Sequence, residues 1–197
     1  MTVGIAGHGS AIAREFMKLL PRAERAVCER LADMPSDLDH YLVCAGHLEG
    51  WSLMQISDAS AQRTWLANFI EPARFCDRAL LTNPKARICV IGSESGFLGS
   101  YDMAYAGAKA ALHLYVETKR LTSPHQQLVA IAPTIISDAG MTGRRRDRDK
   151  LEARAARTRH RRWLEAREVA ELAHHALFAA TSFLSGTVIR LRAVEGA

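Results

Sequence analysis

A chain of 197 residues, 48% of them hydrophobic, is long enough to bury one core and too short for two comfortable ones, so we expect one domain spanning residues 1–197. The four cysteines show no C-x-x-C spacing and fall mostly in apolar stretches, which indicates buried thiols and a cytoplasmic location. No apolar run approaches ~18 residues, and the N-terminus lacks a basic region followed by a long apolar core, so neither a membrane span nor secretion is expected.

The first expected strand covers residues 2–6. It leads into G-H-G-S-A-I-A at residues 7–13 and then into a helical run at residues 14–20. A strand, a glycine-containing turn and a helix start would aim free backbone N–H groups and the positive end of the helix at a pyrophosphate. Taken alone, the same pattern fits a strand–helix turn without a ligand equally well.

The second expected strand covers residues 25–31, and three charged residues compete near its end. In nucleotide-binding sheets an acid at this place bonds the ribose hydroxyls of NAD, whereas an arginine favours the 2′-phosphate of NADP. Glu29 and Asp33 favour the first cofactor and Arg30 the second. The choice between NAD and NADP therefore stays open.

Only residues 34–39 separate this region from the next expected strand, at residues 40–45. That gap leaves no room for the helix and strand that usually intervene in a nucleotide-binding sheet. We therefore expect a sheet that is trimmed on the adenine side. His47 follows this strand directly, and we interpret it as a polar turn residue rather than a catalytic base.

Residues 59–81 form a long helical pattern that Pro72 interrupts. Proline has no N–H and cannot bond the carbonyl four residues earlier, so we expect the carbonyl of Asn68 to be free. Two interpretations expose the same carbonyl. Either one helix carries a local defect, or a second helix begins at Pro72 after a break.

An apolar strand at residues 87–91 runs into Gly92 and Ser93, and would deliver a hydroxyl to its carboxyl end, where ligands bind in open α/β sheets. If residues 104–120 form a helix, Tyr105 and Lys109 lie at i and i+4 on one face. An ammonium beside a phenol favours the phenolate, so the pair would exchange a proton closer to neutral pH than the phenol's ordinary pKa of ~10. Taken alone, Tyr-x-x-x-Lys also fits a solvated or packing pair.

The last third of the chain contains an expected strand at residues 127–132, a variable loop at about residues 137–163, a helix that opens at Ala166 and a closing strand at residues 185–191. Residues 144–162 hold ten Lys or Arg against three acids, a net of +7, whereas the whole chain is +5. Because like charges repel unless an anion offsets them, we expect this loop to be mobile and to close over an anionic substrate. A solvated helix and an acidic patch on a partner subunit are the alternatives.

In this order, the motifs resemble the short-chain dehydrogenase/reductase family over nearly the whole chain. Its T-G-x-x-x-G-x-G turn reads A-G-H-G-S-A-I-A here, with alanine at the second and third glycines. In its N-N-A-G strand end, Cys44 replaces the second asparagine. The stretch P-T-I-I-S-D-A-G-M at residues 133–141 is similar to P-G-x-x-x-T-x-M, with Thr134 where glycine is usual.

The resemblance implies a Rossmann-like α/β fold with a mostly parallel sheet of about six strands, and NAD(P)-dependent reduction of a carbonyl or oxidation of an alcohol. Tyr105 would be the acid/base, Lys109 would lower its pKa and hold the nicotinamide ribose, and Asn68 would hold a relay water through its main-chain carbonyl. Ser93 would bond the substrate oxygen, with Ser95 as a second candidate. A nucleotide-binding protein of this fold without redox turnover is the rival interpretation.

For the cofactor, NAD or NADP, the resemblance and the strand ends imply a site without a metal. Its expected residues are Gly7, His8, Ser10, Ile12, Glu29, Arg30, Asp33, Cys44, Ala45, Gly46, Tyr105, Lys109, Pro133, Thr134 and Ile136. The expected partners are a small carbonyl or alcohol substrate and further copies of the chain, packed through the tyrosine helix and its neighbour. We expect no nucleic-acid partner, because no aromatic platform accompanies the basic loop.

Overall fold

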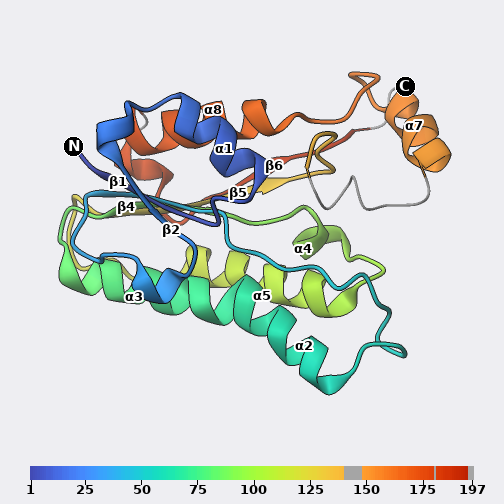
Figure 1. Cartoon of the computed structure of the whole chain (residues 1–197), viewed down its shortest axis with the longest axis horizontal. Coiled ribbons are helices and arrows are strands. Elements are labelled where there is room, and N and C mark those ends of the chain that lie inside the picture. The colour runs from blue at the N-terminus through green and yellow to red at the C-terminus, as the bar shows by residue number, and fades with distance from the viewer. Residues whose placement is uncertain (140–147, 180, 195–197) are drawn as a thin grey trace.

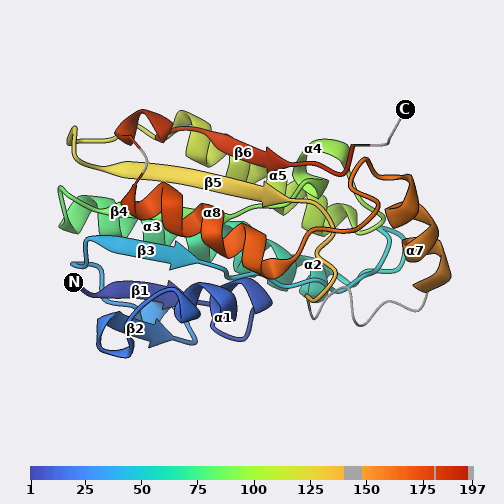
Figure 2. The same ribbon diagram turned by 90° about the horizontal axis from the view of Figure 1, so that it is seen from above.

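Six short strands pair side by side into one parallel sheet in the order β2-β1-β3-β4-β5-β6 (Figure 2). The computed structural model describes residues 1–139, 148–179 and 181–194. The strands are β1 (Val3–Ala6), β2 (Arg25–Cys28), β3 (His40–Val43), β4 (Arg87–Ile91), β5 (Gln127–Pro133) and β6 (Val188–Leu191). The expected sheet of about six strands is confirmed, and every pairing in it is parallel.

Helices cover both faces of the sheet and make three layers (Figure 1). One face carries α1 (Ala11–Lys18) and α8 (Ala166–Phe178). The other carries α2 (Asp58–Trp65), a π-helical turn (Leu66–Ile70), α3 (Glu71–Thr82) and α5 (Met103–Thr118). Two further helices, α4 (Ser95–Leu98) and α7 (Arg148–Arg157), lie beyond the carboxyl ends of the strands.

Because successive side chains of a strand point to opposite faces of the sheet, the core consists of two hydrophobic clusters, one on each face. In β3, Leu42 packs in the cluster that contains Phe16 of α1. Its neighbours Tyr41 and Val43 pack in the cluster that contains Phe75 of α3, where the rings of Tyr41 and Phe75 meet edge to face at 5.1 Å. A parallel sheet buried on both sides explains why its central strands read as continuous apolar runs.

The connection from β2 to β3 is as short as the sequence indicates. Residues 29–39, which the structure describes throughout, contain a 3₁₀ turn (Leu31–Asp33) and no α-helix or strand. The trimmed adenine side is therefore confirmed. The strand itself ends earlier than expected, at Cys28, because the turn directs the buried side chain of Leu31 into the core.

Other elements also differ from those expected. The strand β3 ends at Val43 rather than at residue 45, β6 begins at Val188 rather than at residue 185, and α5 ends at Thr118 rather than at residue 120. The first helix begins at Ala11 rather than at residue 14, with Ser10 as its N-cap. In the pattern at residues 59–81 the helical backbone is continuous, and it passes from α2 through a π-helical turn into α3. The region at residues 137–163 is not a loop throughout, because it contains α7. Among the helices of the described residues, none is both long and apolar enough to cross a membrane.

Candidate active site

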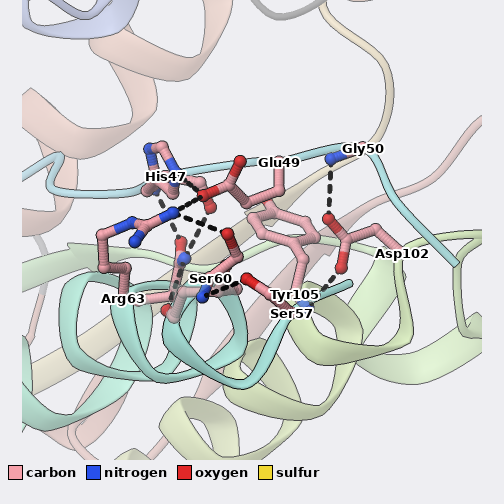
Figure 3. A network of polar contacts seen from close by, with 10 residues as sticks. His47, Glu49, Gly50, Ser57, Ser60, Arg63, Asp102 and Tyr105 are labelled. Atoms are coloured by element: carbon pink, nitrogen blue, oxygen red, sulfur yellow. Dashed lines mark hydrogen bonds and ion pairs between the residues drawn. The ribbon is translucent and has the colours of Figure 1, made fainter. Parts of the chain in front are cut away.

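Most of the expected site residues lie at or just beyond the carboxyl ends of β1 to β5, which meet at one edge of the parallel sheet, and the others lie on helices. Ligands of open α/β sheets bind at this edge. The helix α5 packs beside it and begins at a well-defined cap. Its N-cap Asp102 is 2% exposed and accepts hydrogen bonds from the amides of Tyr105 and Gly50, both at 2.9 Å (Figure 3). One carboxylate thus fixes both the start of the tyrosine helix and the loop that follows β3.

Tyr105 and Ser93 meet at this edge and are both buried. The Ser93 hydroxyl accepts a hydrogen bond from the Ser95 amide at 3.2 Å and lies near the Tyr105 side chain. The pKa of Tyr105 is raised above its ordinary value, chiefly by burial, while the nearby Ser93 lowers it and the charge of Asp102 raises it further. The expected lowering by Lys109 is therefore wrong for the free protein. Its Nζ lies 5.8 Å from the centre of the Tyr105 ring, and burial decides the direction.

Lys109 is 3% exposed, and its Nζ donates a hydrogen bond to the carbonyl of Ile91 at 2.9 Å. Burial lowers its pKa to about 8, while the neighbouring Cys44 raises it. A Cβ added to Gly46 would lie 3.6 Å from this Nζ and 3.1 Å from Oδ1 of Asn68. Lys109 and Asn68 therefore border the same glycine, as a shared site requires.

Asn68 is fully buried within the π-helical turn. Because Pro72 has no N–H, the Asn68 carbonyl lacks its i+4 donor, and the helix continues through a π turn rather than breaking. The Asn68 side chain also fixes the loop after β3. Its Oδ1 accepts from the His47 amide at 3.2 Å, and its Nδ2 donates to the carbonyls of His47 and Thr64 at 2.6 and 2.8 Å. The sequence alone predicted a role for the main-chain carbonyl of Asn68 but none for its side chain.

The loop that Asn68 fixes continues into a polar network on the surface (Figure 3). Nε2 of His47 lies 3.0 Å from Glu49, which also pairs with Arg63 at 3.0 Å. Hydrogen bonds from these two side chains lower the pKa of Glu49. His47 is therefore engaged in an exposed ion-pair network, which agrees with its interpretation as a polar turn residue.

The turn between β1 and α1 is where the sequence predicts that a pyrophosphate binds. Gly7 has φ +75°, and a Cβ there would lie 2.6 Å from the Cys44 carbonyl oxygen, so glycine is required. A Cβ at Gly9 would meet nothing within 4 Å. The N-cap Ser10 makes no side-chain hydrogen bond to the first turn of α1. Ala11 and Ala13, which replace glycines of the family pattern, have their side chains in the core, where they do not obstruct this turn.

The other expected cofactor residues lie near the same edge. Glu29 and Arg30 are exposed at the end of β2, and Nε of Arg30 lies 3.8 Å from Oδ2 of Asp33. Cys44 lies near Ser10 and Lys109, and burial raises the pKa of its thiol to about 12. The remaining members lie at or just beyond the strand ends, in the turn after β1 and, for Ile12, within α1, where its side chain packs in the core. These are His8, Ile12, Ala45, Pro133, Thr134 and Ile136.

Two neighbours of Ser93 were not expected from the sequence. Glu94 is 7% exposed, and its Oε1 lies 3.6 Å from Arg190 and 3.5 Å from Arg192 at the end of β6. His113 is 3% exposed, and its Nε2 accepts a hydrogen bond from the Ser93 amide at 3.3 Å. The sequence did contain a signal for the histidine. Tyr105, Lys109 and His113 follow one another at intervals of four residues, which places them on one face of the helix.

Only part of the basic stretch at residues 144–162 lies within the residues that the structure describes. Arg144, Arg145 and Arg146, on which the expected closure over an anion depends, lie outside the described residues. The helix α7 that follows is anchored by buried Leu151, whose carbonyl accepts a hydrogen bond from Nε1 of Trp163 at 3.1 Å. A cavity of about 220 Å³ lies nearby. Its lining includes Thr134, Thr158, His160, Arg162, Trp163, Glu168, Arg190 and Arg192.

This architecture is the fold of the short-chain dehydrogenases/reductases, and the expected resemblance is confirmed at the level of fold. A short-chain dehydrogenase/reductase of the glucose/ribitol dehydrogenase type from Brucella melitensis superposes with a TM-score of 0.84 at 18% identity, over 96% of this chain and 94% of that one. A variant of actinorhodin polyketide ketoreductase with NADPH gives 0.83 at 14% identity, over 98% and 96%. A small-chain dehydrogenase in complex with NADPH gives 0.80 at 18%, over 98% and 97%. No protein-family model and no curated protein matches the sequence.

Proposed function

We propose that this protein is an NAD(P)-dependent oxidoreductase that reduces a carbonyl compound or oxidises the corresponding alcohol. The observation that carries the proposal is the proximity of the buried side chains of Tyr105 and Ser93, with Lys109 beside them. Two neighbouring hydroxyls at a ligand-binding edge can hold one carbonyl oxygen between them. The superposition on dehydrogenases and a ketoreductase supports the same reaction class.

Tyr105 is the general acid for reduction in this proposal. Burial raises its pKa, so the phenol keeps its proton at neutral pH and can give it to the substrate oxygen. Ser93 holds that oxygen by a second hydrogen bond. Oxidation needs the phenolate instead, so it should be favoured at higher pH, and Lys109 would then stabilise the negative oxygen electrostatically.

Lys109 and Asn68 complete the arrangement beside Gly46, which both of them border. The Lys109 ammonium, fixed to the Ile91 carbonyl, would hold the nicotinamide ribose. The Asn68 main-chain carbonyl, which Pro72 cannot engage, would hold a water that returns protons from solvent. The Asn68 side chain keeps this carbonyl in place, because it is itself bonded on three sides.

A nicotinamide dinucleotide would supply or accept the hydride when it is bound. Its pyrophosphate would lie on the N-terminus of α1, at the turn of Gly7 and Gly9. Its adenosine end would lie near Arg30 and Asp33 at the end of β2. Because these two side chains form an exposed ion pair, the site can turn either an arginine or a carboxylate to the ribose, and we propose NAD or NADP.

The substrate that we propose is a small carbonyl or alcohol. An anionic compound is favoured because three arginines line the cavity beyond the strand ends, Arg162, Arg190 and Arg192, whereas only two carboxylates of the described residues, Glu168 and Glu94, pair with them. The test is to measure oxidation of NADH and NADPH against a panel of ketones and aldehydes that includes carboxylates, phosphate esters and their neutral analogues. Turnover with any member supports the proposal. Absence of turnover despite cofactor binding would instead support the second candidate.

The second candidate is a dinucleotide-binding protein of this fold without redox turnover. The observation that favours it is Cys44, a buried thiol of raised pKa at the position where the family has an asparagine. Against it, Ser93, Tyr105 and Lys109 are all present and in contact with one another or with the strand end. A protein that only binds has no use for a hydroxyl pair at this edge.

We also propose a cytoplasmic location, which the four free cysteines support.

Both cofactors are expected to bind, and the preference between them should depend on Arg30. The change Arg30→Gln removes the charge that would pair with a 2′-phosphate, so it should weaken NADPH binding about tenfold or more and leave NADH nearly unaffected. The matched change Asp33→Asn should act in the opposite direction. Calorimetric titration of the three proteins measures the effects. Failure of the unchanged protein to bind either cofactor at millimolar concentration would contradict the proposed cofactor site.

We also propose a homo-oligomer that packs through α5 and the helices beside it. Leu114 of α5 is 61% exposed, and Trp65 and Leu66 are 38% and 40% exposed on the neighbouring elements. Such a patch of large apolar side chains is typical of an interface. Light scattering should report a multiple of the monomer mass of 21.7 kDa, and the change Leu114→Glu should reduce it. A monomer at every concentration tested would exclude this interface.

A further inference from the structure

The tyrosine helix makes a third contact with the site, through His113. Tyr105, Lys109 and His113 lie four residues apart on α5, and all three side chains are buried against the loop that follows β4. Tyr105 lies near the Ser93 side chain, Lys109 donates a hydrogen bond to the Ile91 carbonyl, and Nε2 of His113 accepts a hydrogen bond from the Ser93 amide. The histidine is therefore the residue that holds the backbone of the proposed substrate-binding serine.

The Ser93 amide needs this acceptor because no strand supplies one. On either side of it, the amides of Gly92 and Glu94 continue the ladder to β5 and donate to the carbonyls of Ile131 and Pro133 at 2.7 and 2.9 Å. Backbone groups alternate along an extended chain, so the Ser93 amide faces the opposite way, toward β3. The β3 pairing ends at Val43, opposite Val90. A buried amide beyond that point must find a partner elsewhere.

The loop is shaped around the imidazole ring. A Cβ at Gly92 would collide with Nε2 of His113, and a Cβ at Gly96 would lie 2.6 Å from its Cε1. Phe97 stacks on the imidazole ring, with ring centroids 4.6 Å apart. The Arg190 guanidinium in turn lies 4.1 Å from the centre of the Phe97 ring. Two glycines and one aromatic ring thus accommodate a histidine one helical turn beyond Lys109.

The ring is held in the protonation state that accepts a hydrogen bond. Burial and the charges of Lys109 and Arg190 lower the pKa of His113 to about 4, so the imidazole is neutral at physiological pH and carries a lone pair on Nε2. Nδ1, which then bears the proton, has no hydrogen-bond partner among the described residues. An unpartnered buried donor costs stability, so packing alone does not explain a histidine here.

We propose that His113 is a positioning residue, which fixes the Ser93 amide through Nε2 and thereby holds the Ser93 hydroxyl against Tyr105. The proposal rests on the proposed oxidoreductase function for its catalytic consequence, though not for the contact itself. In this role His113 does not touch substrate or cofactor. It acts through the backbone of Ser93, and its loss should be felt in the chemical step rather than in cofactor binding.

Two substitutions separate positioning from packing. The change His113→Gln keeps an acceptor near the position of Nε2, whereas His113→Leu keeps apolar volume and removes the acceptor. We expect His113→Leu to lower kcat between about tenfold and a hundredfold, with the Kd of the cofactor unchanged and His113→Gln largely restoring the rate. Equal kcat values for His113→Leu and the unchanged protein would overturn the proposal, as would an equal loss in both variants.

The contact can be tested without turnover, so failure of the proposed function would not obscure it. In nitrogen NMR spectra of the labelled protein, Nε2 of His113 should show the unprotonated, hydrogen-bonded form at neutral pH, and Nδ1 should carry the proton. The Ser93 amide proton should shift in His113→Leu and return toward its original position in His113→Gln. A proton on Nε2, or a Ser93 amide that is insensitive to both changes, would contradict the assignment.

A third variant, Gly92→Ala, changes the loop instead of the helix. It tests the same contact if the His113 variants fail to fold. In Gly92→Ala the new methyl group meets the imidazole as its nearest neighbour, so it should displace His113 and lower kcat to a similar extent. Adding His113→Ala removes this collision. The double variant should recover folding stability but not kcat, and recovery of kcat as well would show that the hydrogen bond is not required.

Discussion

Replacing Tyr105 with phenylalanine is expected to lower kcat by ~10²-fold or more while leaving the Kd of the cofactor nearly unchanged. The change removes the transferable proton and little surface. It also removes one of the two neighbouring hydroxyls that would hold the substrate oxygen, and it leaves the hydroxyl of Ser93 in place. Steady-state rates with a substrate found in the panel, together with calorimetric titration of NADH and NADPH, measure the two quantities separately.

A matched control lies on the same helix. The Tyr115 hydroxyl donates to Oδ1 of Asp77 at 2.7 Å and lies 3.3 Å from the Ala73 carbonyl, on the side where α5 packs against α3. Tyr115→Phe should therefore cost about 1 kcal/mol in the free energy of unfolding and leave kcat nearly unchanged. Retention of more than about a tenth of kcat in Tyr105→Phe would not fit a general acid.

The sequence predicted the parts of this site that depend on local spacing. Helical spacing places Tyr105 and Lys109 on one face, and the strand before Ser93 places a hydroxyl at the carboxyl edge of the sheet. Both follow from residues that are close in the chain. The short gap before β3 likewise predicted the missing helix and strand, because residues 34–39 cannot contain them.

The remaining features depend on contacts between distant segments. The Tyr105 pKa was predicted in the wrong direction because its sign is set by burial, which spacing does not reveal. The three bonds of the Asn68 side chain join residues separated by up to 21 positions. The pairing of Glu94 with Arg190 joins β4 to the far end of β6. None of these leaves a periodic signal in the sequence.

The second large effect is expected from Lys109→Met, which should lower kcat by ~10²-fold or more and also weaken cofactor binding. The first loss follows because the charge that favours the phenolate disappears. The second follows from the proposed bond between Nζ and the nicotinamide ribose. This double effect distinguishes Lys109 from Tyr105, whose replacement should spare binding. Lys119→Met is the matched control, because Lys119 pairs with Asp77 at the other end of the helix and should affect neither quantity.

The same variant should change how stability depends on pH. Below about pH 8, Lys109 is charged in both the folded and the unfolded chain, and its burial destabilises the folded state. Between about pH 8 and pH 10.5, the folded chain loses this proton while the unfolded chain keeps it, so the contribution of Lys109 to stability rises with pH. A pKa lowered from 10.5 to about 8 corresponds to about 3 kcal/mol.

Chemical denaturation of both proteins from pH 7 to pH 10.5 measures this contribution directly. The free energy of unfolding of Lys109→Met, minus that of the unchanged protein, should fall by about 3 kcal/mol over this range, whatever its value at pH 7. Other titrating groups cancel in the difference, since they are common to both proteins. A difference that stays constant with pH would show that Lys109 keeps its ordinary pKa, and that the buried ammonium is compensated by a partner other than the Ile91 carbonyl. A falling difference together with lost turnover would show that the fold retains a destabilising charge where the proposed chemistry needs one.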